Sequence, residues 1–449
     1  MTSDTSLLHR LTGLLLTSVI GVSLGFGCRK AAPDEVVNGG DLGSGGNPSG
    51  SGGTGNQAGS AGSTSLPDGG LELHCEAPEP HADPTFTKQK LLEAAADCAA
   101  FQYCRFEGAA GALREAASGF AATPDAQHRD TARAAWQQAI NAWEEAELFS
   151  FGPAAASTEP GGKDFRNLIY SWPLNGRCKV DEQIVSRFYE TPDFFGPPTR
   201  SLINGRTLSA LEYLAYYEGT DNGCHQLSPI NSNRTWAAIE PSALTARKAA
   251  YAAAAAEDVF TQARALVQAW QPEQGNFRAT LTQTGNPVFA SEQAALNAIS
   301  DAMFYLEKQV KDQKLGVPLG LLPECPSPPC VDAVESRWAN ASLEHVRSNL
   351  RGFRGLFQGC GVGNAGIGFD DWLVATGSAD LADRMLRALD AADAAATGLD
   401  QPLQQLLVAD LARVRALHEA IRGVTTLLKT EFVTNLNLEL PATSEGDND

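Results

Sequence analysis

The stretch Thr207-Leu-Ser-Ala-Leu-Glu-Tyr-Leu214 is the one around which the rest of the chain is interpreted. Its apolar residues have helical spacing, and we expect one helix from residue 199 to residue 217. Glu212 lies near the middle of that helix. Two interpretations of this carboxylate stay open: it binds a metal or a cationic group, or it pairs with an arginine in a helix–helix contact.

Outward from this helix, the same helical character extends from about Phe86 to near the C-terminus. Alanine and leucine recur at helical spacing, and no strand-like alternation persists. We therefore expect an all-α protein of two packed antiparallel helical bundles, roughly 86–270 and 291–436, within a domain covering 72–449. The expected helices are 88–106, 126–149, 180–189, 199–217, 235–270, 291–312, 331–357, 370–375, 378–396 and 403–436. We expect an interruption at 108–111 and a rigid non-helical loop at 314–320.

The N-terminus has the pattern of an export signal. Arg10 precedes an apolar run that is too short to span a bilayer comfortably, so residues 1–27 are predicted to be a signal peptide. Gly27 before Cys28 suggests lipid attachment at Cys28; the alternative is ordinary secretion with Cys28 left free. Residues 28–71 are rich in glycine and serine and predict a disordered tether. We therefore expect a bacterial cell-envelope protein, lipid-anchored at the outer membrane or the periplasmic face.

The cysteine count agrees with export. The chain has nine cysteines, and setting Cys28 aside leaves eight, enough for four disulfides in an oxidising compartment. Cys325 and Cys330 close a short loop and are the first expected pair; Cys98 with Cys104 and Cys178 with Cys224 are further guesses, since eight cysteines allow 105 pairings.

The net charge of −19 argues against binding to nucleic acid or to an anionic membrane surface. It is compatible with cation capture, although a soluble, solvated surface also accounts for it.

Four segments together resemble the imelysin family of exported bacterial proteins. They lie at 132–153, at 170–175, at 207–214 and at 314–352, in the family's order, and they cover most of residues 86–436. The resemblance implies an all-helical fold of two bundles, a cell-envelope location and an association with iron uptake or iron-regulated expression. Founding members were described as peptidases, but no HExxH motif occurs here to support a zinc peptidase.

The family's signature is Gly-x-His-x-x-Glu, in which residues three apart on a helix share a face and converge on one cation. Here Thr207 stands at the glycine position and Ser209 at the histidine position, so only Glu212 remains. A serine hydroxyl is a poor ligand for a transition metal beside imidazole. No other histidine lies at nearby helical spacing, although His225 in the following loop could approach.

A second polar group, Glu335-Ser336-Arg337, is expected near Glu212 because the resemblance places the corresponding glutamate beside the signature helix. Glu212 and Glu335, with Ser209, would favour a hard cation, such as an iron or another divalent or trivalent ion. Arg206 or Arg337 could instead neutralise the carboxylates, and Trp172 could wall the cleft. We therefore expect a ligand-binding or metal-binding protein; the alternatives are an interaction protein with a degenerate site and, least favoured, a peptidase.

Overall fold

The computed structural model describes residues 75–79, 85–174, 176–196 and 205–441. They all belong to one compact unit, Ser63–Asp449. The predicted signal peptide, Cys28 and the predicted tether lie outside the described residues, as do the start of the helix expected from residue 199 and the last residues of the chain. The described part contains helices and no strand, so the predicted all-α class is confirmed.

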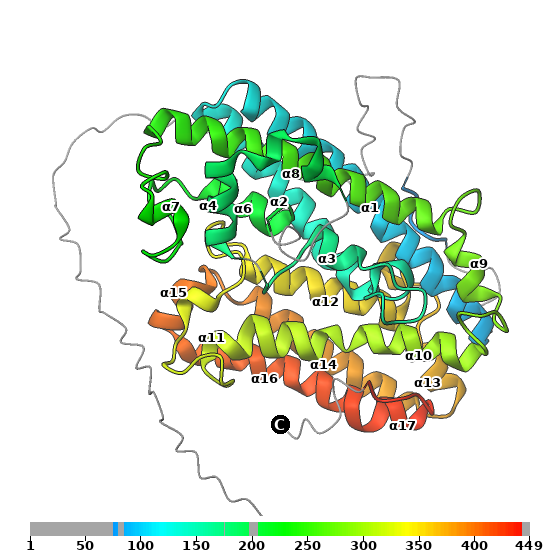
Figure 1. The fold of residues 1–449 in the computed structure, drawn as a ribbon. Helices are drawn as coiled ribbons and strands as arrows, with labels where there is room; N and C mark the ends of the chain where they lie inside the picture. Colours follow the sequence, from blue (N-terminus) through cyan, green and yellow to red (C-terminus); the bar gives the residue numbers. More distant parts are fainter. Residues whose placement is uncertain (1–74, 80–84, 175, 197–204, 442–449) are drawn as a thin grey trace, which may run out of the picture. The chain divides into compact units, whose positions relative to one another are not determined.

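The first group of helices consists of α1 (Lys88–Ala122), α2 (Ala126–Ala146), α6 (Leu208–Tyr216) and α8 (Pro241–Trp270). α1 packs against both α2 and α8, and α6 packs against α2 and α8 (Figure 1). α1 begins where the Thr87 side chain accepts a hydrogen bond from the Lys90 amide, and α2 begins where Asp125 does the same for His128. Pro241 occupies the first turn of α8, where a missing N–H has no cost.

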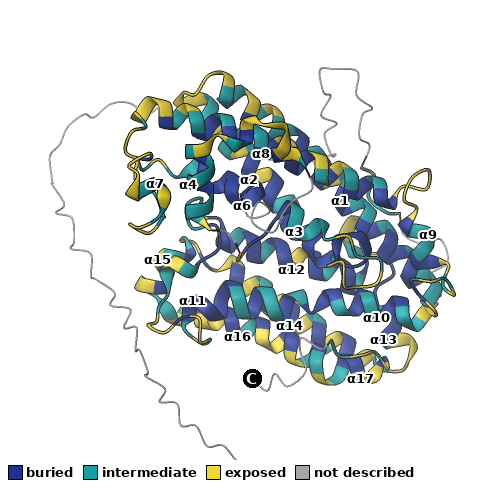
Figure 2. Ribbon diagram, in the orientation of Figure 1, coloured by how far each residue is buried: buried dark blue, intermediate teal, exposed yellow. Residues whose placement is uncertain are grey.

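The second group is built on the π-helix η5 (Leu306–Gly316), α12 (Ser342–Gln358), α14 (Ala379–Thr397) and α16 (Leu411–Leu427). α14 packs against α12 and α16, and η5 packs against α12 and α16. α12 also packs against α2, and one hydrophobic cluster runs through both groups (Figure 2). The junction between the groups is therefore part of the core.

Shorter elements complete the chain. They are η1 (Glu147–Phe149), η2 (Gly152–Ala154), α3 (Phe165–Ile169), α4 (Arg177–Ser186), η3 (Phe188–Glu190), η4 (Pro192–Phe195), α7 (Pro229–Ser232), α9 (Phe277–Thr282), α10 (Glu292–Met303), α11 (Val317–Leu319), η6 (Val331–Ala333), η7 (Val362–Asn364), α13 (Phe369–Ala375), α15 (Leu403–Ala409), η8 (Leu428–Phe432) and α17 (Val433–Asn435).

Several local predictions were wrong, among them the single helix expected over 403–436, which is interrupted at Asp410 between α15 and α16. α1 continues through Gly108 and Gly111, because Gly111 lets α1 lie close to Phe260 of α8, and packing against two helices outweighs the low helix propensity of glycine. The stretch 314–320 is helical through Leu319, with Pro318 in the first turn of α11. The helix expected from residue 331 begins only at Ser342, after a turning segment in which Ser336 and Asn340 have positive φ.

The eight cysteines of the described residues form four disulfides, as their number predicted. The pairs Cys325–Cys330 and Cys178–Cys224 are as expected. Cys98 with Cys104 was wrong: Cys104 pairs with Cys75, and Cys98 pairs with Cys360. Both correct partners come from segments that only tertiary folding brings to α1.

None of the helices in the described part combines the length and the apolar character needed to cross a membrane.

Candidate functional site

A cluster of buried polar side chains lies where the two helical groups meet. α2 contributes Glu144, α12 contributes His345 and Asn349 one turn apart, and η5 contributes Lys314. Glu335 comes from the segment between η6 and α12. All five side chains are buried. Because buried charges are retained only when they are paired or bind an ion, this cluster is the first place to look for function.

The centre of the cluster is formed by two carboxylates and one imidazole. His345 Nδ1 lies 3.2 Å from Glu144 Oε1 and 3.0 Å from Glu335 Oε2. One ligand atom from each of the three residues lies within 4.8 Å of the other two. This separation would allow all three to contact a single cation.

Lys314 is the positively charged side chain that pairs with both carboxylates of the cluster. Its Nζ lies 3.1 Å from Glu335 Oε2, donates to Asn349 Oδ1 at 2.9 Å and makes a close contact with Glu144 Oε2. Asn349 in turn donates to the Glu144 backbone carbonyl and to its Oε2. One carboxylate oxygen of Glu144 is thus fully occupied, and the other faces His345.

Several atoms at the centre have no hydrogen-bond partner of good geometry. They are Glu144 Oε1, Glu335 Oε2 and both ring nitrogens of His345. Buried polar atoms are almost always hydrogen-bonded, so a group of unsatisfied ones facing one another needs an explanation. A cation bound among them would satisfy the two carboxylate oxygens and one ring nitrogen together.

The electrostatics of the two carboxyls differ. Burial and the neighbouring Glu335 charge raise the pKa of Glu144. The pKa of Glu335 is lowered, because Lys314 and His345 together outweigh the effect of its burial. Burial alone would lower the pKa of His345, but Glu144 and Glu335 raise it. The cluster therefore favours the ionised form of Glu335 and disfavours the ionised form of Glu144.

A second layer of polar residues extends from the cluster toward the surface. The Tyr170 hydroxyl donates to Glu335 Oε1 at 2.8 Å. Glu147 accepts from Trp143 Nε1 at 2.8 Å and from Arg166 Nε at 3.1 Å, and Tyr305 makes a close hydrogen bond to it. Arg166 and Tyr305 are partly exposed, so this side of the cluster is the nearest to solvent.

Glu212 lies beside this cluster but makes different contacts. Its Oε1 accepts from the backbone amides of Trp338 and Ala339 at 2.9 and 3.0 Å. Burial raises its pKa to about 7. Its side chain is only 1% exposed, so it does not line an open cleft. Ser209 bonds to the Thr207 hydroxyl at 2.8 Å, and Thr207 in turn to Ser171.

The other residues singled out from the sequence lie around the cluster. Arg337 pairs with Asp332, and its guanidinium lies over the Trp338 ring. Arg206 pairs with Asp258, so the ion-pair partner of each arginine is a residue other than Glu212. Trp172 is buried, and its carbonyl accepts from Arg166. His225 is exposed, and its ring accepts from the Leu227 amide.

Sequence reasoning missed Glu144, His345 and Lys314 as members of one site. His345 is the most important of these residues. It lies far from Ser209 in the sequence, so the helical spacing of the signature motif gave no reason to include it in the site. A usable signal existed: His345 and Asn349 are polar residues at i and i+4 on the buried face of α12. Nothing in the sequence linked that face to Glu144.

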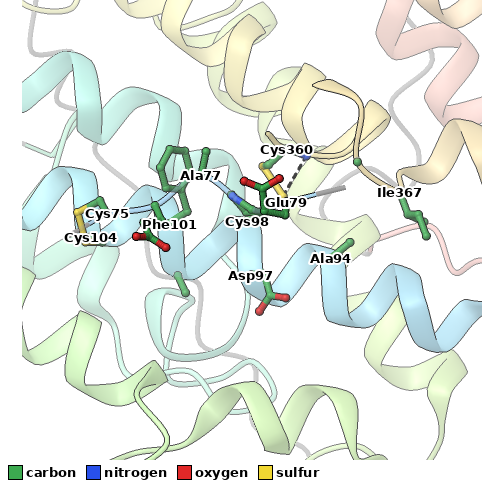
Figure 3. Close-up of a pocket in the computed structure, with 14 residues that line it drawn as sticks. Cys75, Ala77, Glu79, Ala94, Asp97, Cys98, Phe101, Cys104, Cys360 and Ile367 are labelled. Carbon is green, nitrogen blue, oxygen red and sulfur yellow. Dashed lines mark hydrogen bonds between the residues drawn. A yellow bond between two sulfur atoms is a disulfide. The ribbon is translucent and has the colours of Figure 1, made fainter. Parts of the chain in front are cut away.

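Two cavities border other parts of the described chain. One of about 560 Å³ lies between residues 75–79, α1 and the stretch 360–367, with two disulfides in its wall (Figure 3). The other, of about 190 Å³, lies beside Arg129, Glu218 and Lys248. Neither is lined by Glu144, Glu335 or His345.

The donor set fits a metal ion in its chemistry. Imidazole and carboxylate together suit iron, manganese or zinc, whereas a purely oxygen-based set would favour calcium or magnesium. The three ligand atoms face one another at ion-pair distance, and the Lys314 ammonium is the cation with which a metal ion would compete.

Comparison with known proteins gives consistent results. The family model described as imelysin matches residues 100–430. The iron-regulated protein A of Synechococcus elongatus is 26% identical over 257 residues, which is 56% of this chain and 59% of that protein. The chain thus matches somewhat more than half the length of this curated relative.

Two crystal structures share the fold. A candidate iron-regulated protein A precursor from Parabacteroides distasonis has a TM-score of 0.58 at 15% identity, covering 78% of this chain and 96% of that one. An imelysin-like protein from Psychrobacter arcticum has a TM-score of 0.56 at 15% identity, covering 79% and 96%.

Proposed function

The chain belongs to the imelysin family, and from that premise we propose that it binds a metal cation, with iron as the first candidate, at Glu144, Glu335 and His345. The observation that carries the proposal is the convergence of three buried ligand atoms within 4.8 Å of one another, which make ion-pair contacts but no hydrogen bond of good geometry. The name of the curated relative, iron-regulated protein A, supports a role connected with iron.

The chemistry of the cluster agrees with a borderline divalent ion. Two carboxylates and one imidazole match the ligand preferences of ferrous iron and manganese, and Lys314 would move away from the carboxylates as the ion enters. The expected involvement of Glu335 is kept in this proposal, and Glu144 and His345 join it.

We further propose that the protein works in the bacterial cell envelope, held to a membrane by a lipid on Cys28. The export pattern of residues 1–27 and the family's exported members support this. Mass spectrometry of the mature N-terminus tests it: a diacylated Cys28 is expected, and Cys28→Ala should release the protein from the membrane fraction. A mature chain with an unmodified Cys28 would contradict the lipid anchor.

Metal binding is tested on the full mature protein. Metal analysis after purification should be followed by anaerobic titration with ferrous, manganous and calcium ions, for wild type and Glu335→Gln. We expect ferrous or manganous binding that Glu335→Gln weakens by on the order of a hundredfold. Glu182→Gln is the control, because Glu182 lies outside the cluster, and its two neighbouring sulfur atoms, of Cys178 and Cys224, are joined in a disulfide and are not free thiolate ligands. No binding tighter than about 1 mM would remove the proposal.

One observation favours the alternative of an interaction protein with a degenerate site. Lys314 already neutralises both carboxylates, so the cluster is also a complete ion-pair network between the two helical groups. On this alternative, wild type binds no metal and Glu335→Gln affects only stability. Peptidase activity is the least favoured function, and a peptidase assay with and without chelator checks it.

A further inference from the structure

The segment 334–341 joins η6 to α12 and carries Glu335 into the buried cluster. It has no regular structure of its own, and Ser336 and Asn340 have φ of 45° and 55°. Between these two turns, the amides of Trp338 and Ala339 both point at one oxygen of Glu212. A carboxylate that accepts from two backbone N–H groups makes charge-assisted bonds, which are among the strongest that such a segment can form.

Side chains reinforce the same contact. The Trp338 ring packs on Tyr213 and Tyr217, with ring centroids 5.1 and 6.4 Å away. Tyr213 lies in the last turn of α6, and Tyr217 directly follows this helix. On the other side, Gln404 donates to the Arg337 carbonyl at 2.8 Å. The segment is thus held between α6 of the first group and α15, which packs against α16 of the second group.

We propose that Glu212 is a positioning residue that fixes the segment 334–341 against α6 and thereby holds Glu335 next to Glu144 and His345. It does not act as a metal ligand in this chain. Its accepting oxygen is already bonded to two amides, and coordinating a metal through that oxygen would take from both part-buried amides the carboxylate acceptor that holds them against α6. The carboxylate of the signature helix therefore serves the site indirectly.

The contact between Glu212 and the amides of segment 334–341 does not depend on the proposed function. Its effect on Glu335 as a metal ligand does rest on the proposed function. Two substitutions separate the roles. Glu212→Gln keeps a carbonyl oxygen that accepts from both amides, but it removes the negative charge that a ligand needs. Glu212→Ala removes the acceptor altogether. Ser209→Ala is the matched control, because Ser209 is a buried polar residue of α6 whose hydroxyl bonds to Thr207.

The first measurement is hydrogen exchange of the peptide that contains Trp338 and Ala339, in metal-free protein. We expect exchange about tenfold or more faster in Glu212→Ala, because the amides lose their acceptor. Glu212→Gln should stay within about threefold of wild type, and so should Ser209→Ala. Equal exchange in all four proteins, or exchange in Glu212→Gln as fast as in Glu212→Ala, would overturn the positioning role.

The second measurement is ferrous or manganous affinity. We expect Glu212→Gln to bind within about threefold of wild type and Glu212→Ala to lose about 10- to 100-fold, as do residues that orient a ligand. A loss of more than about a hundredfold in Glu212→Gln would make Glu212 a ligand and overturn the inference. If wild type itself binds no metal, the proposed function fails, and the hydrogen exchange alone then decides the anchoring.

Discussion

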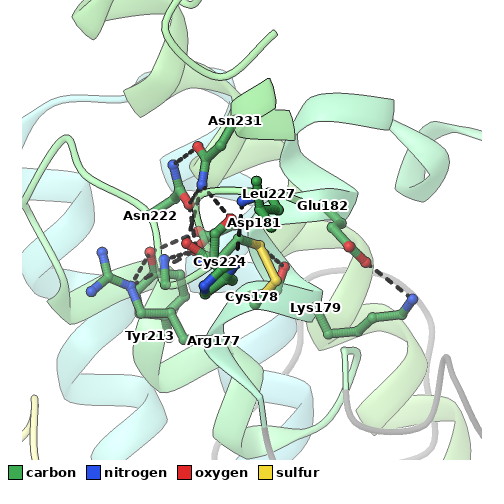
Figure 4. Close-up of a disulfide and its surroundings, with 12 residues drawn as sticks. Arg177, Cys178, Lys179, Asp181, Glu182, Tyr213, Asn222, Cys224, Leu227 and Asn231 are labelled. Atoms are coloured by element: carbon green, nitrogen blue, oxygen red, sulfur yellow. Dashed lines mark hydrogen bonds and ion pairs between the residues drawn. A yellow bond between two sulfur atoms is a disulfide. The ribbon is translucent and has the colours of Figure 1, made fainter. Parts of the chain in front are cut away.

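Two buried acidic clusters lie beside α6, and they differ in how well their oxygens are hydrogen-bonded. One is centred on Asp181 of α4, whose Oδ1 accepts from the Tyr213 hydroxyl at 2.8 Å and whose Oδ2 accepts from the Gly223 amide at 2.7 Å (Figure 4). Arg177 lies 3.8 Å from Oδ2 and bonds to Tyr213 as well. Every oxygen of this carboxyl has a donor, and all the donors come from the first helical group and the loop after α6.

The other cluster, at Glu144, Glu335 and His345, is equally buried but leaves atoms without good hydrogen bonds. Its members come from both helical groups. Burial of a carboxylate is therefore not enough to identify a binding site. A carboxylate whose oxygens are all hydrogen-bonded, such as Asp181, holds a loop against a helix. A group of carboxylates from several elements that lacks hydrogen bonds of good geometry can instead bind a cation.

The largest effect is expected when the resident cation is removed. Lys314→Met leaves Glu144 and Glu335 buried beside each other without an ammonium, which should lower the free energy of unfolding by about 3–5 kcal/mol. Because a bound metal would replace the missing charge, manganous or ferrous ion should restore much of this loss. Urea unfolding with and without the ion measures both changes.

The matched control for Lys314→Met lies close to the other cluster. Lys248 is also buried, but it donates to the carbonyls of Tyr217 and Gly219. Lys248→Met should cost about 1–3 kcal/mol and gain nothing from the metal. Equal rescue of both variants, or no rescue of Lys314→Met, would contradict the distinction between the clusters.

A smaller effect is expected from Asp181→Asn. The amide loses one of the two hydrogen bonds that Asp181 accepts, so the free energy of unfolding should fall by about 1–3 kcal/mol. Metal affinity should stay within about threefold of wild type, because the substitution lies outside the cluster. Urea unfolding and titration with ferrous ion check the two parts, and a large drop in affinity would show that the clusters are coupled through α6.

The fold was predictable because its signal is local. Alanine and leucine at helical spacing, with start signals such as Asp125, placed at least one end of α1, α2, α8, α12 and α14 within a few residues. The stretch 314–320 was predicted to be a non-helical loop because of Pro318 and Gly320. Proline and glycine often interrupt a helix, but proline is also favoured in the first turn of a helix and glycine at its left-handed C-terminal end.

The candidate site was only partly predictable, because it depends on pairings between distant segments. Glu335 was found through its resemblance to family members. His345 was not, since it lies 133 residues after Glu212 and reaches the cluster only when α12 packs on α2. The partner of Cys98 was hidden for the same reason: Cys360 is 262 residues away.

The last prediction concerns the pH dependence of stability at the Asp181 cluster. Burial raises the pKa of Asp181 to about 6, above the 3.8 of an ordinary aspartate. A raised pKa in the folded state contributes stability that is complete below the ordinary value and is lost as pH rises through about 6. The difference in unfolding free energy between wild type and Asp181→Asn should therefore fall between pH 4 and pH 7, with a slope of at most about 1.4 kcal/mol per pH unit. Urea unfolding of both proteins at several pH values measures it. A difference that stays constant or grows with pH would mean that Tyr213, Gly223 and Arg177 together stabilise the ionised form, and their contacts would then outweigh burial at this carboxyl.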